Sequence, residues 1–175
     1  EGSYVLGNED GIHKVWNEQG VLIESSQWSN GKRVQKTQKW NSEKQLLSSY
    51  EYNSSGKKHG DTVENCDDGS PRLQTQYSNG EREGSYRRWS CEDGEIEKEG
   101  TYRGGLNVGP YLDRTSSTVR RGSYSETEPG RRIGRWQIGD HKIDYNVESF
   151  QSNEYLKVFS KFGGFTGRDE DFNLH

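Results

Sequence analysis

Residues that could carry out chemistry are few in this sequence, and they lack the spacings that catalysis or metal binding requires. The four histidines, His13, His59, His141 and His175, share no ligand spacing with one another or with the two cysteines. The sequence contains no Gly-x-Ser-x-Gly elbow and no Gly-Lys-Ser/Thr phosphate loop. Acidic residues number 28, so pairs of carboxylates carry little information. We therefore expect no enzymatic activity, no metal site and no cofactor.

The composition instead favours a thin β structure. Hydrophobic residues make up 26% of the 175 residues and charged residues 30%, which is typical of disorder, but aromatic residues reach 11%. A single-layered sheet reconciles these values, because regularly placed rings can supply the burial that a thick core would otherwise provide. The net charge of −4 argues against nucleic acid as a partner. No apolar run is long enough to span a bilayer.

An internal repeat of about 24–25 residues organises residues 1–139. Turn signals such as Asn30-Gly31 and Asn79-Gly80 separate short runs rich in Val, Ile, Thr, Tyr and Trp, which predicts antiparallel β-hairpins. A glycine opens most units, and Gln35 replaces it in the second. Gly100 and Gly122 are expected beneath neighbouring rings. The aromatic residues expected to build the structure are Trp16, Trp28, Trp40, Tyr52, Tyr77, Trp89, Tyr102, Tyr124 and Trp136. The fold class is therefore all-β: an elongated, single-layer array of antiparallel hairpin repeats.

The pattern Gly-x-x-x-x-Trp, then Xaa-Gly-x-Leu, then aromatic-x-Asn-Gly-Lys resembles the MORN-type repeat, in the bacterial form found in YwqK-like antitoxin and immunity proteins. The best matches are residues 11–31 and 84–105, and the resemblance covers roughly residues 2–139. It implies an elongated sheet of successive hairpins. It also implies roles such as an antitoxin or immunity partner of a toxin, a scaffold subunit or a membrane-associated module.

The repeat arranges charges at its turns, and all turns of one kind should lie along one edge of the sheet. A basic edge is predicted from Lys32, Arg33, Lys57, Lys58, Arg82, Arg131 and Arg132. An acidic edge is predicted from Glu18, Glu43, Asp67, Asp68, Glu92 and Asp93. Either edge is a candidate partner-binding site, although turns are solvated and commonly charged for that reason alone.

The two cysteines fall in the acidic turns Cys66-Asp67-Asp68-Gly69 and Cys91-Glu92-Asp93-Gly94. Equivalent positions in consecutive hairpins lie two strand spacings apart, about 10 Å. A disulfide needs a Cα separation of about 4.4–6.8 Å. We therefore predict two free thiols, unless strong twist of the sheet brings the two turns together.

The leading functional hypothesis is a module that binds another protein, either a toxin or a subunit of a larger assembly. The alternative is recognition of glycans or anionic lipids through exposed rings and the basic edge. Residues 140–175, which leave the repeat and become apolar, are expected to form a C-terminal cap or a partner-docking segment. The absence of any methionine indicates that the natural start has been removed, which slightly favours an exported protein.

Overall fold

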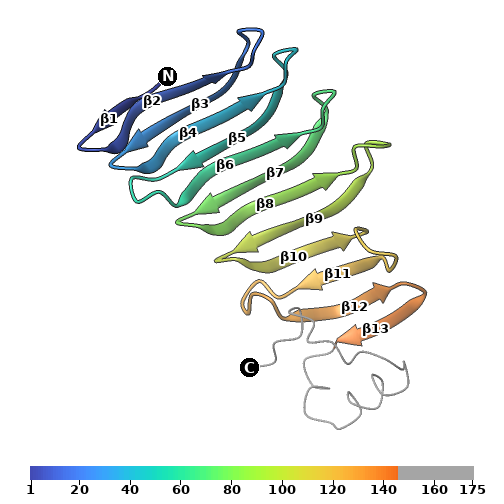
Figure 1. The fold of residues 1–175 in the computed structure, drawn as a ribbon. Coiled ribbons are helices and arrows are strands. Elements are labelled where there is room, and N and C mark those ends of the chain that lie inside the picture. Colours follow the sequence, from blue (N-terminus) through green and yellow to red (C-terminus); the bar gives the residue numbers. More distant parts are fainter. Residues whose placement is uncertain (146–175) are drawn as a thin grey trace.

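The chain forms one open antiparallel sheet in which every strand pairs with its neighbours in sequence (Figure 1). The computed structural model describes residues 1–145, and the predicted cap or docking role of residues 146–175 lies outside them. The strands are β1 (Ser3–Val5), β2 (Asn8–Trp16), β3 (Leu22–Ser29), β4 (Lys32–Trp40), β5 (Leu46–Tyr52), β6 (Lys58–Asn65), β7 (Pro71–Ser78), β8 (Glu81–Trp89), β9 (Ile96–Arg103), β10 (Leu106–Asp113), β11 (Arg120–Tyr124), β12 (Arg132–Ile138) and β13 (His141–Tyr145). The predicted all-β hairpin array is confirmed. The sheet continues through β13, beyond the predicted end of the array at residue 139.

The two kinds of turn lie on opposite edges of the sheet, as expected from the repeat (Figure 1). Tight turns such as Asn30-Gly31 and Asn79-Gly80 join β3 to β4 and β7 to β8. Both asparagines adopt positive φ, 49° and 51°, which this type of hairpin turn demands. We call the edge that carries these turns the basic edge, and the edge that carries the turns after β2, β4, β6 and β8 the acidic edge.

A bulge follows each tight turn and explains the glycine that opens most units. Gly84 in β8 has a φ of 81°, and the register between β7 and β8 shifts beside it. Gln35 holds the same place in β4 with a φ of 56°, a left-handed conformation that is costly for a residue with a Cβ atom. The second unit therefore keeps the bulge without its glycine.

The core is a row of side chains along the middle of one face, which we call the aromatic face. Side chains alternate across a strand, and residues directly opposite each other share a face. Across the strands this row combines small residues with rings. Its members from β3 to β12 are Ser26, Thr37, Tyr50, Thr62, Thr75, Tyr86, Gly100, Tyr111, Gly122 and Trp136. Large rings thus fill the space above small neighbours without a second layer.

The two strand glycines of this row lie beneath rings, as predicted. A Cβ atom built on Gly100 would lie 3.2 Å from Tyr111 Cδ2. One built on Gly122 would overlap the ring of Trp136, far inside van der Waals contact. Trp136 is fully buried, and the rings of Tyr111, Tyr124 and Tyr145 pack around it.

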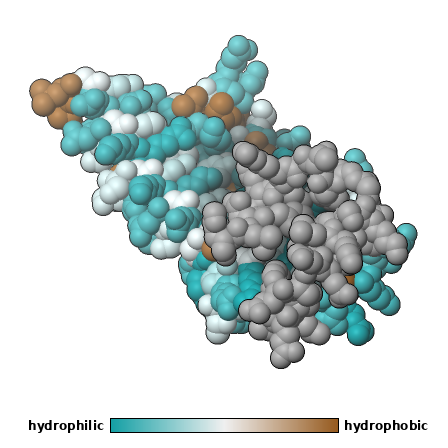
Figure 2. Space-filling model, turned by 90° about the horizontal axis from the view of Figure 1, so that it is seen from below, coloured by the Kyte–Doolittle hydropathy of each residue, from teal (hydrophilic) through white to brown (hydrophobic). Residues whose placement is uncertain are grey.

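The coloured part of the surface in Figure 2 is mostly hydrophilic. Figure 2 shows apolar residues as separate small patches on the face turned to the viewer. Tyr4 and Leu6, near the first turn, are 64% and 99% exposed. Among residues 1–145 there is no helix of the length and apolarity that crossing a membrane would require.

Candidate functional site: rings and cations on the aromatic face

A second row of rings on the aromatic face lies next to a row of basic side chains. Trp28 pairs directly with Arg33, and the arginine carbon Cζ lies 5.0 Å from the centre of the tryptophan ring. Tyr77 pairs with Arg82, and Tyr124 with Arg132. Rings and cations therefore alternate across the sheet, an arrangement in which each cation gains electrostatic attraction from a ring face.

Lys58 and Arg82 each contact two rings. Lys58 Nζ lies 4.4 Å from the ring centre of Tyr50 and 5.1 Å from that of Tyr77. Arg82 Cζ lies 5.0 Å from the ring centre of Tyr86 and 5.4 Å from that of Tyr102. These contacts place both cations on the aromatic face, above the sheet.

The residues of the predicted basic edge therefore divide into two groups. Arg33, Lys58, Arg82 and Arg132 lie over the rings of the aromatic face. Lys32 and Lys57 are exposed at their turns, and Arg131 pairs with Glu128 inside its own turn. The structure does not gather all seven into one site, but it brings four of them into one row with the rings.

The four cations of the row differ in their acidic partners. Arg33 Nη2 lies 2.9 Å from Glu24 Oε1. Within residues 1–145, Lys58 and Arg82 have no carboxylate within ion-pair distance, and the buried Nε of Arg82 has no hydrogen-bond partner. Burial alone would lower the pKa of Arg82, but its hydrogen bond with Tyr77 and the neighbouring tyrosines raise that pKa. Lys58 and Arg82 are thus charged groups with capacity to bind an anion.

Basic side chains outnumber carboxylates on the aromatic face, although the whole chain carries a net charge of −4. At the strand positions of this face the cations are Arg33, Lys39, Lys58, Arg82, Arg88, Lys98, Arg120 and Arg132, and the carboxylates are Glu9, Glu24, Glu64 and Asp113. Many of the remaining carboxylates lie in the turns at the two edges. This separation of charge between face and turns was not expected from the sequence.

Two of the carboxylates on this face are held by tyrosines. Tyr50 donates a hydrogen bond of 2.9 Å to Glu64, and burial together with this carboxylate raises the pKa of Tyr50 to about 12. Tyr111 donates a hydrogen bond of 2.9 Å to Asp113. Burial alone would raise the pKa of Asp113, but hydrogen bonds from Thr115 and Tyr111 lower it to about 2. Asp113 therefore stays ionised inside the structure.

The turns of the acidic edge are stacked, and each turn contacts the next through equivalent positions. The first residue of one turn contacts the second residue of the next: Asn17 Nδ2 donates to Ser42 Oγ at 3.4 Å, and Asn41 Nδ2 donates to the Asp67 carbonyl at 3.0 Å. Each asparagine also accepts two backbone N–H groups of its own turn. Neighbouring hairpins are thus joined at this edge by side chains as well as by the sheet.

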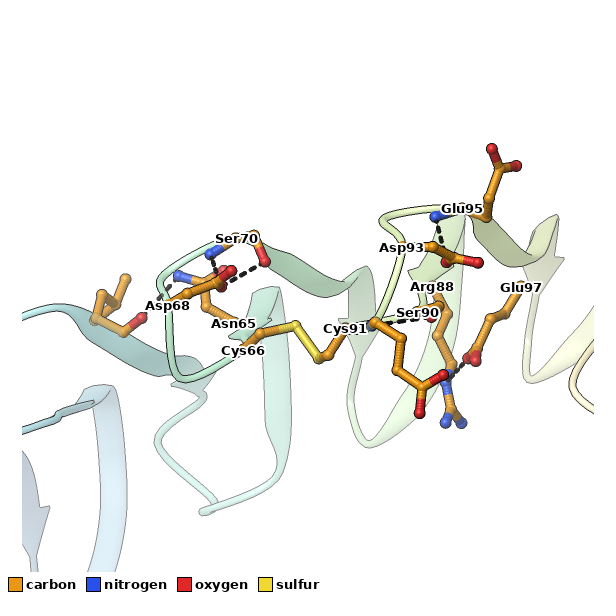
Figure 3. Close-up of a disulfide and its surroundings, with 12 residues drawn as sticks. Asn65, Cys66, Asp68, Ser70, Arg88, Ser90, Cys91, Asp93, Glu95 and Glu97 are labelled. Carbon is orange, nitrogen blue, oxygen red and sulfur yellow. Dashed lines mark hydrogen bonds and ion pairs between the residues drawn. A yellow bond between two sulfur atoms is a disulfide. The ribbon is translucent and has the colours of Figure 1, made fainter.

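The same contact in the next pair of turns is a disulfide between Cys66 and Cys91, with a Cα separation of 5.8 Å (Figure 3). The prediction of two free thiols was wrong, because the two cysteines are not equivalent. The backbone N–H of Cys66 donates to the Ser70 carbonyl and closes its turn. In the next turn the closing bond runs from the backbone N–H of Ser90 to the Glu95 carbonyl, so Ser90 and not Cys91 is the counterpart of Cys66. Cys91 is the second residue of a turn that is one residue longer. It therefore lies at the close contact rather than two full strand spacings away.

The six residues of the predicted acidic edge lie in these turns and are exposed. They are Glu18, Glu43, Asp67, Asp68, Glu92 and Asp93. The side chains of Asp68 and Asp93 accept hydrogen bonds from Ser70 and Glu95 of their own turns. Hydrogen bonds from Ser70 lower the pKa of Asp68, and the backbone N–H of Glu95 lowers that of Asp93. The residues 1–145 contain no group of His, Cys, Asp and Glu side chains that could hold a metal ion.

The nine predicted aromatic residues differ in burial. Tyr102, Tyr124 and Trp136 are buried, whereas Trp28, Trp40, Tyr52, Tyr77 and Trp89 are half-buried and Trp16 is 39% exposed. Strand alternation places Trp16 and Trp40 on the face opposite the aromatic face, and Trp89 lies there beneath Arg87. Tyr50 is not among the nine predicted aromatic residues, because Tyr52, two residues later, is the ring that fits the spacing of the repeat.

Comparisons with known proteins add no assignment: no protein-family model matches this sequence, and no curated protein shows significant similarity to it.

Proposed function

We propose that this chain is a non-enzymatic, protein-binding repeat module. The observation that carries the proposal is the single-layered sheet itself, which keeps tryptophan, tyrosine and arginine side chains half-buried on its faces. These are the residue types most enriched at the energetic centres of protein interfaces. Trp28, Tyr52 and Tyr77 retain accessible ring surface beside basic groups, so a partner could bury both together.

The resemblance to MORN-type repeats supplies two versions of this role. One is an antitoxin or immunity protein that covers a toxin with high affinity. The other is a scaffold subunit of a larger, cell-surface assembly. The Cys66–Cys91 disulfide supports an exported location for either version, because disulfides persist in oxidising compartments.

Copurification from the native host tests the proposal. We expect a partner that elutes with the chain at a fixed molar ratio in size-exclusion chromatography with light scattering. Exchange of backbone amide hydrogens should slow on complex formation in the strands that carry the half-buried rings of one face. A matched pair of variants sharpens the test: Tyr77→Ala removes a half-buried ring, and Gln74→Ala alters an exposed residue of the same strand. Equal binding by both variants, or a chain that always elutes alone, would contradict the proposal.

A second candidate function is recognition of glycans or anionic lipids. It is favoured by the exposure of Trp16 and the half-burial of Trp40 and Trp89, since accessible indole rings can stack on sugars. Tryptophan fluorescence during titration with oligosaccharides tests the glycan version. Retention on anionic vesicles at low salt tests the lipid version, because surface electrostatics is strongest there.

A further inference from the structure

We propose that the aromatic face binds an extended, acidic segment of the partner protein that carries a carboxylate at every third residue. The inference rests on the proposed protein-binding function and specifies the kind of partner segment. It assigns the binding site to the row of cations Arg33, Lys58 and Arg82, together with the rings of Tyr52 and Tyr77 that lie among them.

The spacing of the cations defines the shape of the segment. Arg33, Lys58 and Arg82 lie on β4, β6 and β8, and consecutive members are therefore two strands apart (Figure 1). Two strand spacings amount to about 10 Å. A polyproline II chain rises about 3.1 Å per residue with three residues per turn, so every third side chain points the same way at intervals of about 9 Å. Such a chain, lying across the strands, would present one carboxylate to each cation.

The electrostatics of the row favours carboxylates. Lys58 and Arg82 have no carboxylate within ion-pair distance among residues 1–145, whereas Arg33 already shares Glu24. A carboxylate bound beside Lys58 or Arg82 would therefore neutralise a charge without displacing an existing partner. The rings beneath exclude water from one side of each cation, which strengthens a charge-assisted hydrogen bond.

The rings between the cations supply the apolar part of the site. Tyr52 and Tyr77 are half-buried, and each lies beside a bulge where the neighbouring strand carries Gln35 or Gly60 opposite the ring. The exposed part of each ring can receive a proline or another apolar side chain. Grooves lined with aromatic rings bind polyproline II segments in this way.

A narrow segment fits this face better than a broad anionic surface does. Acidic side chains lie in or directly beside the turns at both ends of the strands, for example Glu43 and Asp67 at the acidic edge and Glu81 and Glu128 at the basic edge, and all four are exposed. A flat membrane or a wide acidic surface pressed against the aromatic face would bring these like charges close. A single extended chain along the row of cations avoids them.

Titration of the whole chain with synthetic peptides tests the inference. The probe is a peptide of four Glu-Pro-Pro triplets. The first control replaces each Glu by Gln, and the second places the same number of Glu residues at every fourth position. Binding is measured by calorimetry and by tryptophan fluorescence, to which Trp28 contributes beside Arg33. We expect the triplet peptide to bind at least about tenfold more tightly than either control and to weaken as salt is added.

Variants of the protein locate the site. The double variant Lys58→Gln/Arg82→Gln should weaken binding at least about fivefold. The matched control Lys36→Gln/Arg72→Gln removes the same charge from exposed positions that strand alternation puts on the opposite face, and its affinity should stay within about twofold of the parent. Circular dichroism checks that each variant is folded. If a variant does not fold, the comparison of the three peptides on the unaltered protein still tests the inference.

The inference is overturned if the Glu and Gln peptides bind alike, if the spacing control binds as tightly as the triplet peptide, or if both double variants weaken binding equally. It is also overturned if the triplet peptide does not bind while anionic vesicles retain the protein through Lys58 and Arg82. A copurified partner complex that survives the Lys58→Gln/Arg82→Gln change would refute this site but leave the protein-binding function intact.

Discussion

Reduction of the Cys66–Cys91 disulfide should destabilise the array by a measurable and calculable amount. The two cysteines are separated by 25 residues in sequence. In the chain-entropy description, cross-linking a loop of that length lowers the entropy of the unfolded state enough to stabilise the fold by about 3.5 kcal/mol. With an ordinary dependence of stability on urea, the unfolding midpoint should fall by about 1–2 M when the bond is reduced.

The assay is urea unfolding followed by tryptophan fluorescence, with and without a phosphine reductant. The double variant Cys66→Ser/Cys91→Ser is the control, because the reductant should leave its midpoint unchanged. Cys91 is exposed and Cys66 is buried, so the single variant Cys66→Ser should cost more than Cys91→Ser under reducing conditions. The reasoning is refuted if the oxidised and reduced proteins unfold at the same urea concentration, or if the unreduced native protein reacts with a thiol reagent.

Three further perturbations test other parts of the structure. Gln35→Gly should stabilise the protein by about 0.5–1 kcal/mol by relieving the positive φ, measured as a higher Tm; an unchanged or lower Tm would count against the strained bulge. Gly122→Ala should destabilise it by about 1–3 kcal/mol in urea unfolding because the new Cβ meets the buried Trp136 ring, whereas Gly100→Ala, with more room, should cost less. The lowered pKa of Asp113 means that its contribution is complete above pH about 4 and is lost as the pH falls towards 2, so the urea midpoint should drop over that range, and drop less in Asp113→Asn.

The fold could be predicted from the sequence because each local signal agreed with the next. Asn-Gly pairs, which accept positive φ, and aromatic residues recur with the same spacing along the sequence. This combination allows only a row of hairpins. Gly100 and Gly122 could be placed beneath rings for the same reason. The all-β class and the arrangement of the turns therefore followed from residue types and spacing alone.

The proposed binding surface and the disulfide could not be predicted in this way because both depend on a shift of one residue. Lys57 and Lys58 are adjacent in sequence, yet only Lys58 has its side chain on the rings, since Lys57 still belongs to the turn and β6 begins at Lys58. Cys66 and Cys91 looked equivalent because each is followed by two acidic residues and a glycine. The extra residue after β8 moves Cys91 to the contact between turns, and that displacement becomes visible only once the backbone hydrogen bonds are known.

The disulfide also determines how the array would respond to a pulling force. A row of hairpins loaded through its two ends can peel open one hairpin at a time, and each opened unit lengthens the chain. The bond between Cys66 and Cys91 bypasses β7 and β8, so a stretch of 25 residues, about 85 Å when fully extended, cannot be drawn out while the bond is intact. The middle of the molecule would then resist extension while the bond is intact. Reduction of the bond would allow these 25 residues to be extended as well.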